Sequence, residues 1–315
     1  CGCTANNNTE KRGIGMRLFP ARDGQSLHVR ILGRGQPVLM LHGLGMQGRD
    51  WLPFVLPYLR CYQFYMPDLR GAGNSAAARF NQADVFHNHM QDMEDLVSHF
   101  GLQDFHLVGY SLGATTSLHW HAHGDFSPVG RYLHIDQTPC IANQPDWAHG
   151  LFGDRQEHFF SQLRELLVLL DAAPDHGRIA NLAAGMREAV LRQLTHILAQ
   201  VAGRPELHSA FRATSRWSGL WARLLPVAEL ADIRAYLQAY LSGSHDYRPS
   251  AADFPVPATV ITGARSPLHP AEGQAAFAKL MGARHVVLPR SGHVPLMSQP
   301  LAFTRALGEF LAGTE

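Results

Sequence analysis

Short apolar runs alternate with segments of helical periodicity through the first part of the chain. Residues 37–41 form a continuous apolar run of the kind that is buried in a parallel sheet, residues 105–108 form a short apolar run, and residues 61–66 are predicted as another strand. Between these runs, apolar residues over 51–59 and 85–100 recur at the spacing of one helix face. This alternation predicts a mostly parallel sheet with helices on both faces.

The strand signal stops after residues 131–135 and resumes only at 258–262, in a last part that ends with a strand and a helix. The pattern between them is helical throughout, with four predicted helices at 159–170, 179–201, 211–225 and 230–241. An alternation of strands and helices that is interrupted once by an all-helical block predicts an inserted helical cap over 141–249. The remaining residues, 16–140 and 250–315, are then the core. Residues 27–32 alternate in polarity as an edge strand does.

Composition excludes several classes of protein. A formal net charge of +1 with 17% charged residues gives no basic surface for nucleic acid. No apolar run reaches the length of about 18 residues that a membrane span needs. The chain is therefore expected to act on a small molecule, without nucleic acid and without a membrane span. Its oligomeric state stays open.

The polar, asparagine-rich residues 1–15 are expected to be a disordered leader or tether. Two interpretations compete. Cys1 is the lipid-bearing start of a processed lipoprotein at the cell envelope, or Met16 is the natural start and the protein is cytoplasmic. The second is favoured because Met16 leads directly into a strand-like segment.

A candidate nucleophile follows the apolar run 105–108. Residues 109–113 are Gly-Tyr-Ser-Leu-Gly, and residues 114–118 have the character of a helix. Strand, G-x-S-x-G and helix together predict a nucleophile elbow, in which Ser111 lies on a strained turn with its hydroxyl exposed above the sheet. The two glycines fit this turn because a side chain would collide where strand and helix fold back on each other.

Three more motifs occur in a characteristic order. His42-Gly43 follows a predicted strand, residues 68–75 form the glycine-rich loop Asp-Leu-Arg-Gly-Ala-Gly-Asn-Ser, and residues 291–296 are Ser-Gly-His-Val-Pro-Leu. Asp68 and Arg70 in the glycine-rich loop are expected to pair with each other. Together with the elbow, these motifs resemble the α/β-hydrolase fold family from about residue 16 to the C-terminus.

The resemblance implies roles for specific residues. Ser111 would be the nucleophile and His293 the base that removes its proton, because a serine hydroxyl is a poor nucleophile at neutral pH. The backbone N–H groups of Leu112 and Leu44 would form the oxyanion hole. His42 is expected to organise its loop by hydrogen bonding.

The third member of the triad departs from the common pattern of the family. Ser266 stands after the penultimate strand, where the family usually has an aspartate. Asp136, which follows the strand 131–135, is expected to replace it and keeps the family's order of Ser, Asp and His. Glu272 and Asp253 are alternatives. Asp136 could instead cap the turn at residues 137–139.

Two further groups of side chains have competing interpretations. Trp217, Trp221 and Phe211 in the predicted cap are expected to line an acyl pocket, or to pack the cap helices on the core. His119 and His123 share a helix face, but the sequence places no third ligand beside them. We therefore expect no metal site and no cofactor.

The resemblance implies a serine hydrolase that cleaves a carboxylic ester through an acyl-enzyme. The apolar cap favours a hydrophobic acyl or alcohol group, as in a carboxylesterase or lipase. C–C bond hydrolases, thioesterases, acyltransferases and cofactor-free haloperoxidases use the same triad and stay open. A non-catalytic protein that binds a small ligand is the alternative from another class, and Ser266 is the feature that favours it.

Overall fold

A computed structural model describes residues 15–224 and 229–313. The expected leader lies outside the described residues, except for Gly15, which begins the first strand. The predicted α/β fold with a mostly parallel sheet is confirmed. Its eight strands are β1 (Gly15–Pro20), β2 (Ser26–Gly33), β3 (Gln36–Leu41), β4 (Tyr62–Pro67), β5 (Phe105–Tyr110), β6 (Val129–Ile135), β7 (Ala258–Gly263) and β8 (Arg284–Leu288).

The strands form one sheet in the order β1-β2-β4-β3-β5-β6-β7-β8. Strand β2 is antiparallel to both of its neighbours, and all pairs from β4 to β8 are parallel. The expectation of an edge strand at residues 27–32 is wrong, because β1 pairs along β2 and takes the edge position. The polar residues of β2 alternate with buried apolar ones along a strand that has a neighbour on each side.

Helices connect the strands and fill the long interval between β6 and β7. Those outside this interval are α1 (Leu52–Val55), α2 (Val85–Phe100), α3 (Leu112–His123), α10 (Ala271–Leu280), α11 (Pro295–Ser298) and α12 (Pro300–Ala312). Those inside it are α4 (Gln156–Asp171), α5 (Ala184–Ala202), α6 (Pro205–Ala213), α7 (Ser218–Leu224), α8 (Leu230–Leu241) and α9 (Arg248–Ala251). We call residues 141–249 the helical insertion.

The single helix predicted over 211–225 is divided in the structure. Thr214 separates α6 from α7 with φ −122° and ψ 22°, outside the helical region. Its hydroxyl donates to the Ala210 carbonyl at 2.6 Å. Threonine side chains compete with the backbone for such bonds, which favours a helix end at this position.

Helix α2 shows how local sequence sets the bounds of an element. The Asp84 carboxylate accepts a hydrogen bond from the Phe86 N–H at 2.9 Å and so caps the first turn. Gly101 ends the helix with φ 58°, a left-handed conformation that glycine adopts without strain. Between these ends, one apolar face including Met93 and Leu96 is buried.

The sheet separates two apolar cores. Alternate residues of β3 point to opposite faces: Val38 and Met40 pack with side chains of α1 and α12, while Leu39 and Leu41 pack with side chains of α2 and α3. This two-sided burial explains why residues 37–41 form a continuous apolar run. Among the described residues, no helix has the length and apolar character that crossing a membrane requires.

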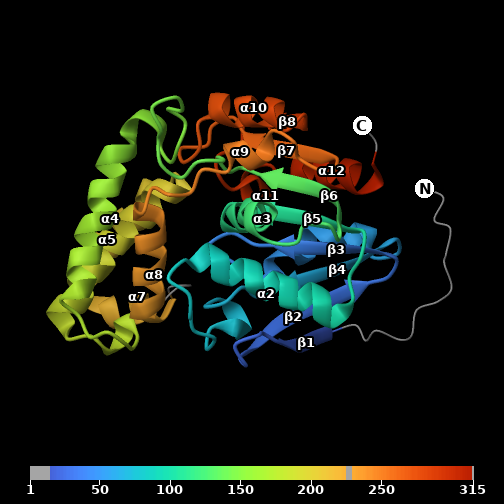
Figure 1. The fold of residues 1–315 in the computed structure, drawn as a ribbon. Helices are drawn as coiled ribbons and strands as arrows, with labels where there is room; N and C mark the ends of the chain where they lie inside the picture. The colour runs from blue at the N-terminus through green and yellow to red at the C-terminus, as the bar shows by residue number, and fades with distance from the viewer. Residues whose placement is uncertain (1–14, 225–228, 314–315) are drawn as a thin grey trace.

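The helical insertion lies at the end of the sheet where the parallel strands finish. In Figure 1, α4, α5, α7 and α8 gather on one side of the molecule, and the arrow of β6 points toward them. Helices α4 and α8 pack against each other, and α8 also contacts α2. Side chains on the loops after the strands therefore face the insertion.

The turn between β5 and α3 depends on close backbone approach. A Cβ added to Gly113 would lie 2.3 Å from the Leu41 carbonyl oxygen of β3. A Cβ on Gly109 would lie 2.8 Å from Ala114 Cα. The glycines of the elbow thus let α3 leave the strand directly against the sheet.

We predict that Gly113→Ala lowers the free energy of unfolding by about 1–3 kcal/mol, because the new methyl group must displace backbone of β3. The matched control is Gly185→Ala, since Gly185 is also the second residue of a helix but has no atom within 4 Å of an added Cβ. That change should be neutral or stabilise by up to about 1 kcal/mol. Urea unfolding measures both, and equal values would contradict the packing argument.

Candidate active site

Ser111 occupies a strained turn between β5 and α3. Its φ of 50° and ψ of −115° lie in a region that side chains with a Cβ rarely adopt. The backbone is held there by the hydrogen bond from Ser111 N–H to the Ile135 carbonyl at 3.1 Å, which ties the turn to the end of β6. Such strain is retained where the surrounding structure enforces it, often at functional sites.

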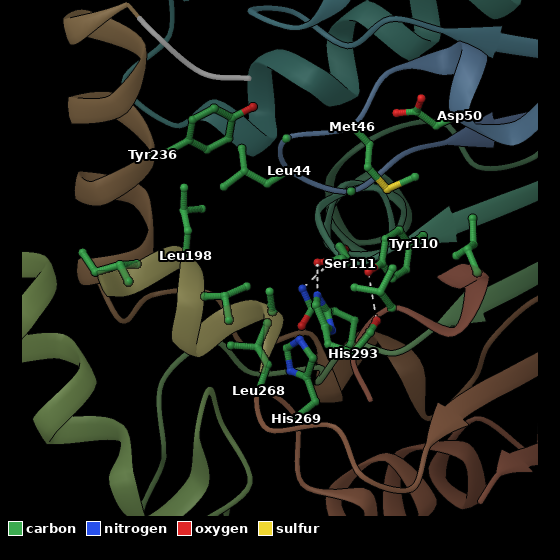
Figure 2. A pocket seen from close by; sticks show the side chains of 18 of the residues that line it. Leu44, Met46, Asp50, Tyr110, Ser111, Leu198, Tyr236, Leu268, His269 and His293 are labelled. Atoms are coloured by element: carbon green, nitrogen blue, oxygen red, sulfur yellow. Dashed lines mark hydrogen bonds between the residues drawn. The ribbon is translucent and has the colours of Figure 1, made fainter. Parts of the chain in front are cut away.

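His293 reaches Ser111 from the loop that follows β8. Its Nε2 lies 3.0 Å from Ser111 Oγ, and both side chains are buried (Figure 2). The Tyr110 hydroxyl donates to the His293 carbonyl at 2.9 Å and anchors this loop. Burial, and then the Asp136 carboxylate, raise the pKa of Tyr110, so that its hydroxyl stays protonated and able to donate.

Asp136 completes the row of hydrogen bonds from the loop after β6. One carboxylate oxygen, Oδ2, accepts from His293 Nδ1 at 2.7 Å and from Ser266 Oγ at 2.8 Å. The other, Oδ1, accepts from Gly263 N–H at 2.8 Å and from Gln274 Nε2 at 3.1 Å. Ser266, which stands where the family usually has an aspartate, therefore donates to the carboxylate of Asp136.

These contacts define the protonation of His293. Because the Asp136 carboxylate can only accept, Nδ1 of His293 carries the proton. Nε2 is then the acceptor that faces the Ser111 hydroxyl. The other candidate acids, Glu272 and Asp253, are both exposed, whereas Asp136 is 0% exposed.

The segment after β3 lies directly over the elbow. A Cβ on Gly43 would lie 2.8 Å from Tyr110 Cε1 and 3.4 Å from Ser111 Cβ, so only glycine allows this approach. The next residue, Leu44, lines the same cavity as Ser111. Leu112 begins α3, and the first N–H groups of a helix have no acceptor within it. Both backbone donors expected for an oxyanion hole thus belong to segments that contact Ser111.

His42 fixes the segment after β3. Its Nδ1 donates to the Gly43 carbonyl at 2.9 Å, and its Nε2 accepts from the Leu69 N–H at 3.0 Å. Burial lowers the pKa of His42, which favours the neutral ring that this pair of bonds requires.

The expected pairing of Asp68 with Arg70 is wrong. Asp68 instead accepts from the Gly48 N–H at 2.7 Å and from the Asn74 N–H at 2.8 Å, and so joins two loops. Arg70 makes a bidentate ion pair with Asp92 of α2 at 2.9 and 2.6 Å. The two side chains leave the loop in different directions, so each finds a partner from another element.

A cavity of about 810 Å³ opens beside Ser111. Its wall is mostly apolar and comes from both parts of the chain: the helical insertion contributes Leu163, Leu166, Leu194, Leu198, Val201 and Leu237 among others, and the rest of the chain contributes Leu44, Leu52, Phe54, Leu268 and Leu296 among others. Figure 2 shows Leu198, Tyr236 and Leu268 along one side of the space next to Ser111 and His293. The site thus combines a hydroxyl–imidazole pair with a large hydrophobic chamber.

The three aromatic residues that were expected in this pocket lie elsewhere. Phe211 is fully buried and packs edge-on against Trp221, with ring centroids 5.7 Å apart. Trp217 is 53% exposed. None of the three is among the described residues that line the cavity. Phe211 and Trp221 contact each other within the helical insertion, and the Trp221 Nε1–H group donates to Thr214 Oγ1 at 2.9 Å.

His269 is a cavity residue that sequence analysis missed. Its ring centroid lies 5.2 Å from that of His293, and Figure 2 shows the two imidazoles side by side. Neither ring nitrogen has a hydrogen-bond partner among the described residues. Burial, and then the neighbouring His293, lower the pKa of His269 well below its usual value, so the ring is neutral. No motif marks this histidine, and only the folded chain places it in the wall.

An eight-stranded, mostly parallel sheet with a serine at the strand-to-helix turn of its central strand defines the α/β hydrolase class of fold. The chain belongs to the alpha/beta hydrolase family, whose sequence profile matches residues 38–306.

The similarity to individual proteins of known sequence or structure covers nearly the whole chain. A pimeloyl-(acyl-carrier protein) methyl ester esterase from Chromobacterium violaceum is 27% identical over 91% of this chain and 98% of its own length. The protein of the same name from Nitrosomonas europaea is 22% identical over 88% of this chain and 96% of its own. An esterase structure from Exiguobacterium antarcticum has a TM-score of 0.70 at 18% identity, covering 95% and 100% of the two chains. At 18% identity, the similarity to the Exiguobacterium antarcticum structure shows the fold alone.

We predict that Asp136→Asn slows covalent labelling of Ser111 by a fluorophosphonate probe about 10⁴-fold, because the amide holds His293 in the wrong tautomer. Asparagine is a suitable replacement because it tolerates the φ of 43° at this position. Glu272→Gln is the matched control and should label at the rate of the unmodified protein. Labelling kinetics followed by intact-protein mass measure both, and similar rates for the two variants would contradict the assignment of Asp136.

Proposed function

We propose that this protein is a serine hydrolase that cleaves carboxylic esters with a hydrophobic acyl or alcohol group. The observation that carries the proposal is the contact of 3.0 Å between Ser111 Oγ and His293 Nε2 at the floor of a large apolar cavity. This contact gives the hydroxyl a base, and the cavity gives a hydrophobic substrate its place.

The proposed reaction proceeds through an acyl-enzyme. Ser111 Oγ attacks the acyl carbonyl carbon while His293 Nε2 takes the hydroxyl proton, and Asp136 stabilises the imidazolium that forms. The N–H groups of Leu44 and Leu112 bind the negative oxygen of the tetrahedral intermediate. His293 then gives its proton to the departing alcohol, and water releases the acid by the same steps.

The shape and polarity of the cavity support the substrate class. Its lining includes aliphatic side chains of α4, α5 and α8 together with apolar side chains of the core, and the charged residues of the lining, Arg49 and Asp50, lie on the segment after β3. Burial of a hydrocarbon chain contributes about 0.8 kcal/mol for each methylene group that leaves water. A chain of several carbons is therefore the part of the substrate that this chamber can bind.

We assign the helical insertion, residues 141–249, the role of a cap over the core formed by residues 16–140 and 250–315. The insertion supplies most of the aliphatic wall, while Ser111, Asp136 and His293 all belong to the core. Acyl-group preference would then depend on the insertion, and the chemical step on the core.

The position of Ser266 supports a catalytic protein over a non-catalytic binding protein. That alternative rested on a serine in place of the expected acid. Ser266 donates to Asp136, which itself contacts His293, so the row of hydrogen bonds has a carboxylate at its end. The names of the relatives from Chromobacterium violaceum and Nitrosomonas europaea also support ester hydrolysis, and methyl esters belong among the substrates to test.

We predict measurable hydrolysis of p-nitrophenyl esters, with kcat/KM rising from acetate to medium-length acyl chains as more methylenes enter the cavity. Methyl esters, thioesters and C–C substrates belong in the same panel, since they separate the related reactions. Ser111→Ala should lower kcat by about 10⁶-fold, toward the residual rate of a site without its nucleophile. Unchanged hydrolysis by Ser111→Ala, or faster turnover of thioester or C–C substrates than of esters, would contradict the proposal.

We predict that Leu198→Trp shifts the substrate preference toward short acyl chains, because the indole ring fills part of the cavity next to Ser111 (Figure 2). The kcat/KM for acetate should stay within about threefold. The kcat/KM for a long-chain ester should fall at least about tenfold, which corresponds to the loss of about two buried methylene groups. The matched control is Val168→Trp on α4, which is 68% exposed and outside the cavity lining. A parallel loss for all chain lengths would contradict the assigned position of the acyl chain.

A further inference from the structure

A second cluster of polar side chains meets at His119, which lies on α3 eight residues after Ser111. Asp84 at the start of α2, His119 on α3 and His245 after α8 each direct a potential ligand atom to one place, and these atoms lie within 4.8 Å of one another. His245 Nε2 is 3.6 Å from Asp84 Oδ2. Both histidines are buried, and Asp84 is partly exposed. Three segments distant in sequence therefore meet at a single point.

Tyr247 orders the two buried histidines. Its hydroxyl lies 3.0 Å from His119 Nδ1 and 3.1 Å from His245 Nδ1. A tyrosine oxygen can accept from both rings, in which case each Nδ1 carries a proton and each Nε2 keeps its lone pair. Histidines that bind metals are held in this way, with the second nitrogen donating to an outer partner. In that arrangement the Nε2 atoms of both rings are available to a metal ion.

A fourth group is placed beside these three. His87 on α2 has its Nδ1 3.4 Å from His119 Nε2, with an angle of 84° between the two rings. In a tetrahedral site the ligand atoms are about 3.3–3.4 Å apart, given metal–nitrogen bonds of about 2.0–2.1 Å. The pairs His87–His119 and His245–Asp84 are thus already near the separation that such a site needs.

We propose that Asp84, His119 and His245 bind a divalent transition-metal ion, with His87 or water in the fourth position. Imidazole nitrogens suit zinc, copper, nickel and iron, whereas magnesium and calcium prefer oxygen ligands. A site with two or three imidazole nitrogens and one carboxylate therefore favours a transition-metal ion over magnesium or calcium.

The position of the cluster indicates what the ion does. His245 and Tyr247 lie in the segment by which the chain leaves the helical insertion. This segment pairs with the entering segment, since Cys140 and Asp246 form an antiparallel bridge and Tyr247 N–H donates to the Pro139 carbonyl at 3.0 Å. Asp84 and His119 belong to helices that pack on the sheet. The ion would fasten the two connections of the insertion to the core.

The proposal departs from the expectation of no metal site, which was based on His119 and His123 alone. His119 and His123 are four residues apart on one helix, and no third ligand could be placed beside them. The fold brings Asp84 and His245 to His119, and neither is near it in sequence. His123 is exposed, with its ring centroid 4.5 Å from that of His119.

The test uses the full, untagged chain after treatment with a chelator and dialysis. Co²⁺ is added while its visible absorption is recorded, and Zn²⁺ is then added to displace it. Mg²⁺ serves as the negative control, since it is not expected to bind. We expect one Co²⁺ per chain, displacement by Zn²⁺ and no response to Mg²⁺. The Tm should rise with the Zn²⁺ concentration, since an ion that binds only the folded chain stabilises it.

Asp84→Asn is the decisive variant, because asparagine caps α2 as well as aspartate does but lacks the charged ligand atom. Its affinity for Zn²⁺ should fall at least about tenfold, since even the loss of an outer-shell partner costs about 10–100-fold. His245→Gln should show a similar loss, and its Tm in chelator reports whether it still folds.

The matched control is His196→Ala, which removes one ring of the His196–His208 pair, whose centroids are 4.9 Å apart in the helical insertion. This variant should bind one ion with unchanged affinity. Absence of binding by the unmodified chain, or binding that Asp84→Asn leaves unchanged, would overturn the proposal. Loss of binding in His196→Ala would place the ion at the other pair and overturn it as well. None of these readouts depends on ester hydrolysis.

Discussion

Parallel pairing from β3 through β8 makes these strands end at the same edge of the sheet, and the chemistry of the site depends on this constraint. The loops after β5, β6 and β8 carry Ser111, Asp136 and His293, which are far apart in sequence. Convergence at one edge reduces the distance between Ser111 Oγ and His293 Nε2 to 3.0 Å. The helical insertion leaves the sheet at this edge too, between β6 and β7, so its apolar wall necessarily faces the same loops.

The buried Asp136 carboxylate is the most demanding part of this arrangement, because a charge without partners in the interior is costly. Four hydrogen bonds satisfy its two oxygens, and they come from three segments: the end of β7 with the turn after it, α10, and the loop after β8. Its φ of 43° and the φ of 50° at Ser111 show that both side chains are held in strained backbone by their surroundings. The stability of the sheet thus supports the strain at the site, and a change at Ser266 or Gln274 would act on His293 through this carboxylate.

Much of this could be predicted from the sequence because the signals are local or depend on chain order. The apolar runs indicated the strands, the flanking glycines indicated the turn at Ser111, and the absence of an aspartate at position 266 pointed to Asp136. Contacts between loops could not be predicted in the same way. The partner of Arg70, the location of Trp217 and the position of His269 beside His293 depend on how separate elements pack. A pattern along one segment carries no information about the side chain that faces it from another.

The central claim is that Ser111 becomes a covalent nucleophile whose reaction centre faces two backbone donors. A crystal structure of the protein after reaction with a long-chain alkylphosphonate p-nitrophenyl ester tests this claim most directly. Our account predicts phosphorus bonded to Ser111 Oγ, a phosphonyl oxygen within hydrogen-bond distance of the Leu44 and Leu112 N–H groups, and the alkyl chain in the cavity beside Leu198. An adduct on another residue, or a phosphonyl oxygen directed away from both N–H groups, would contradict it.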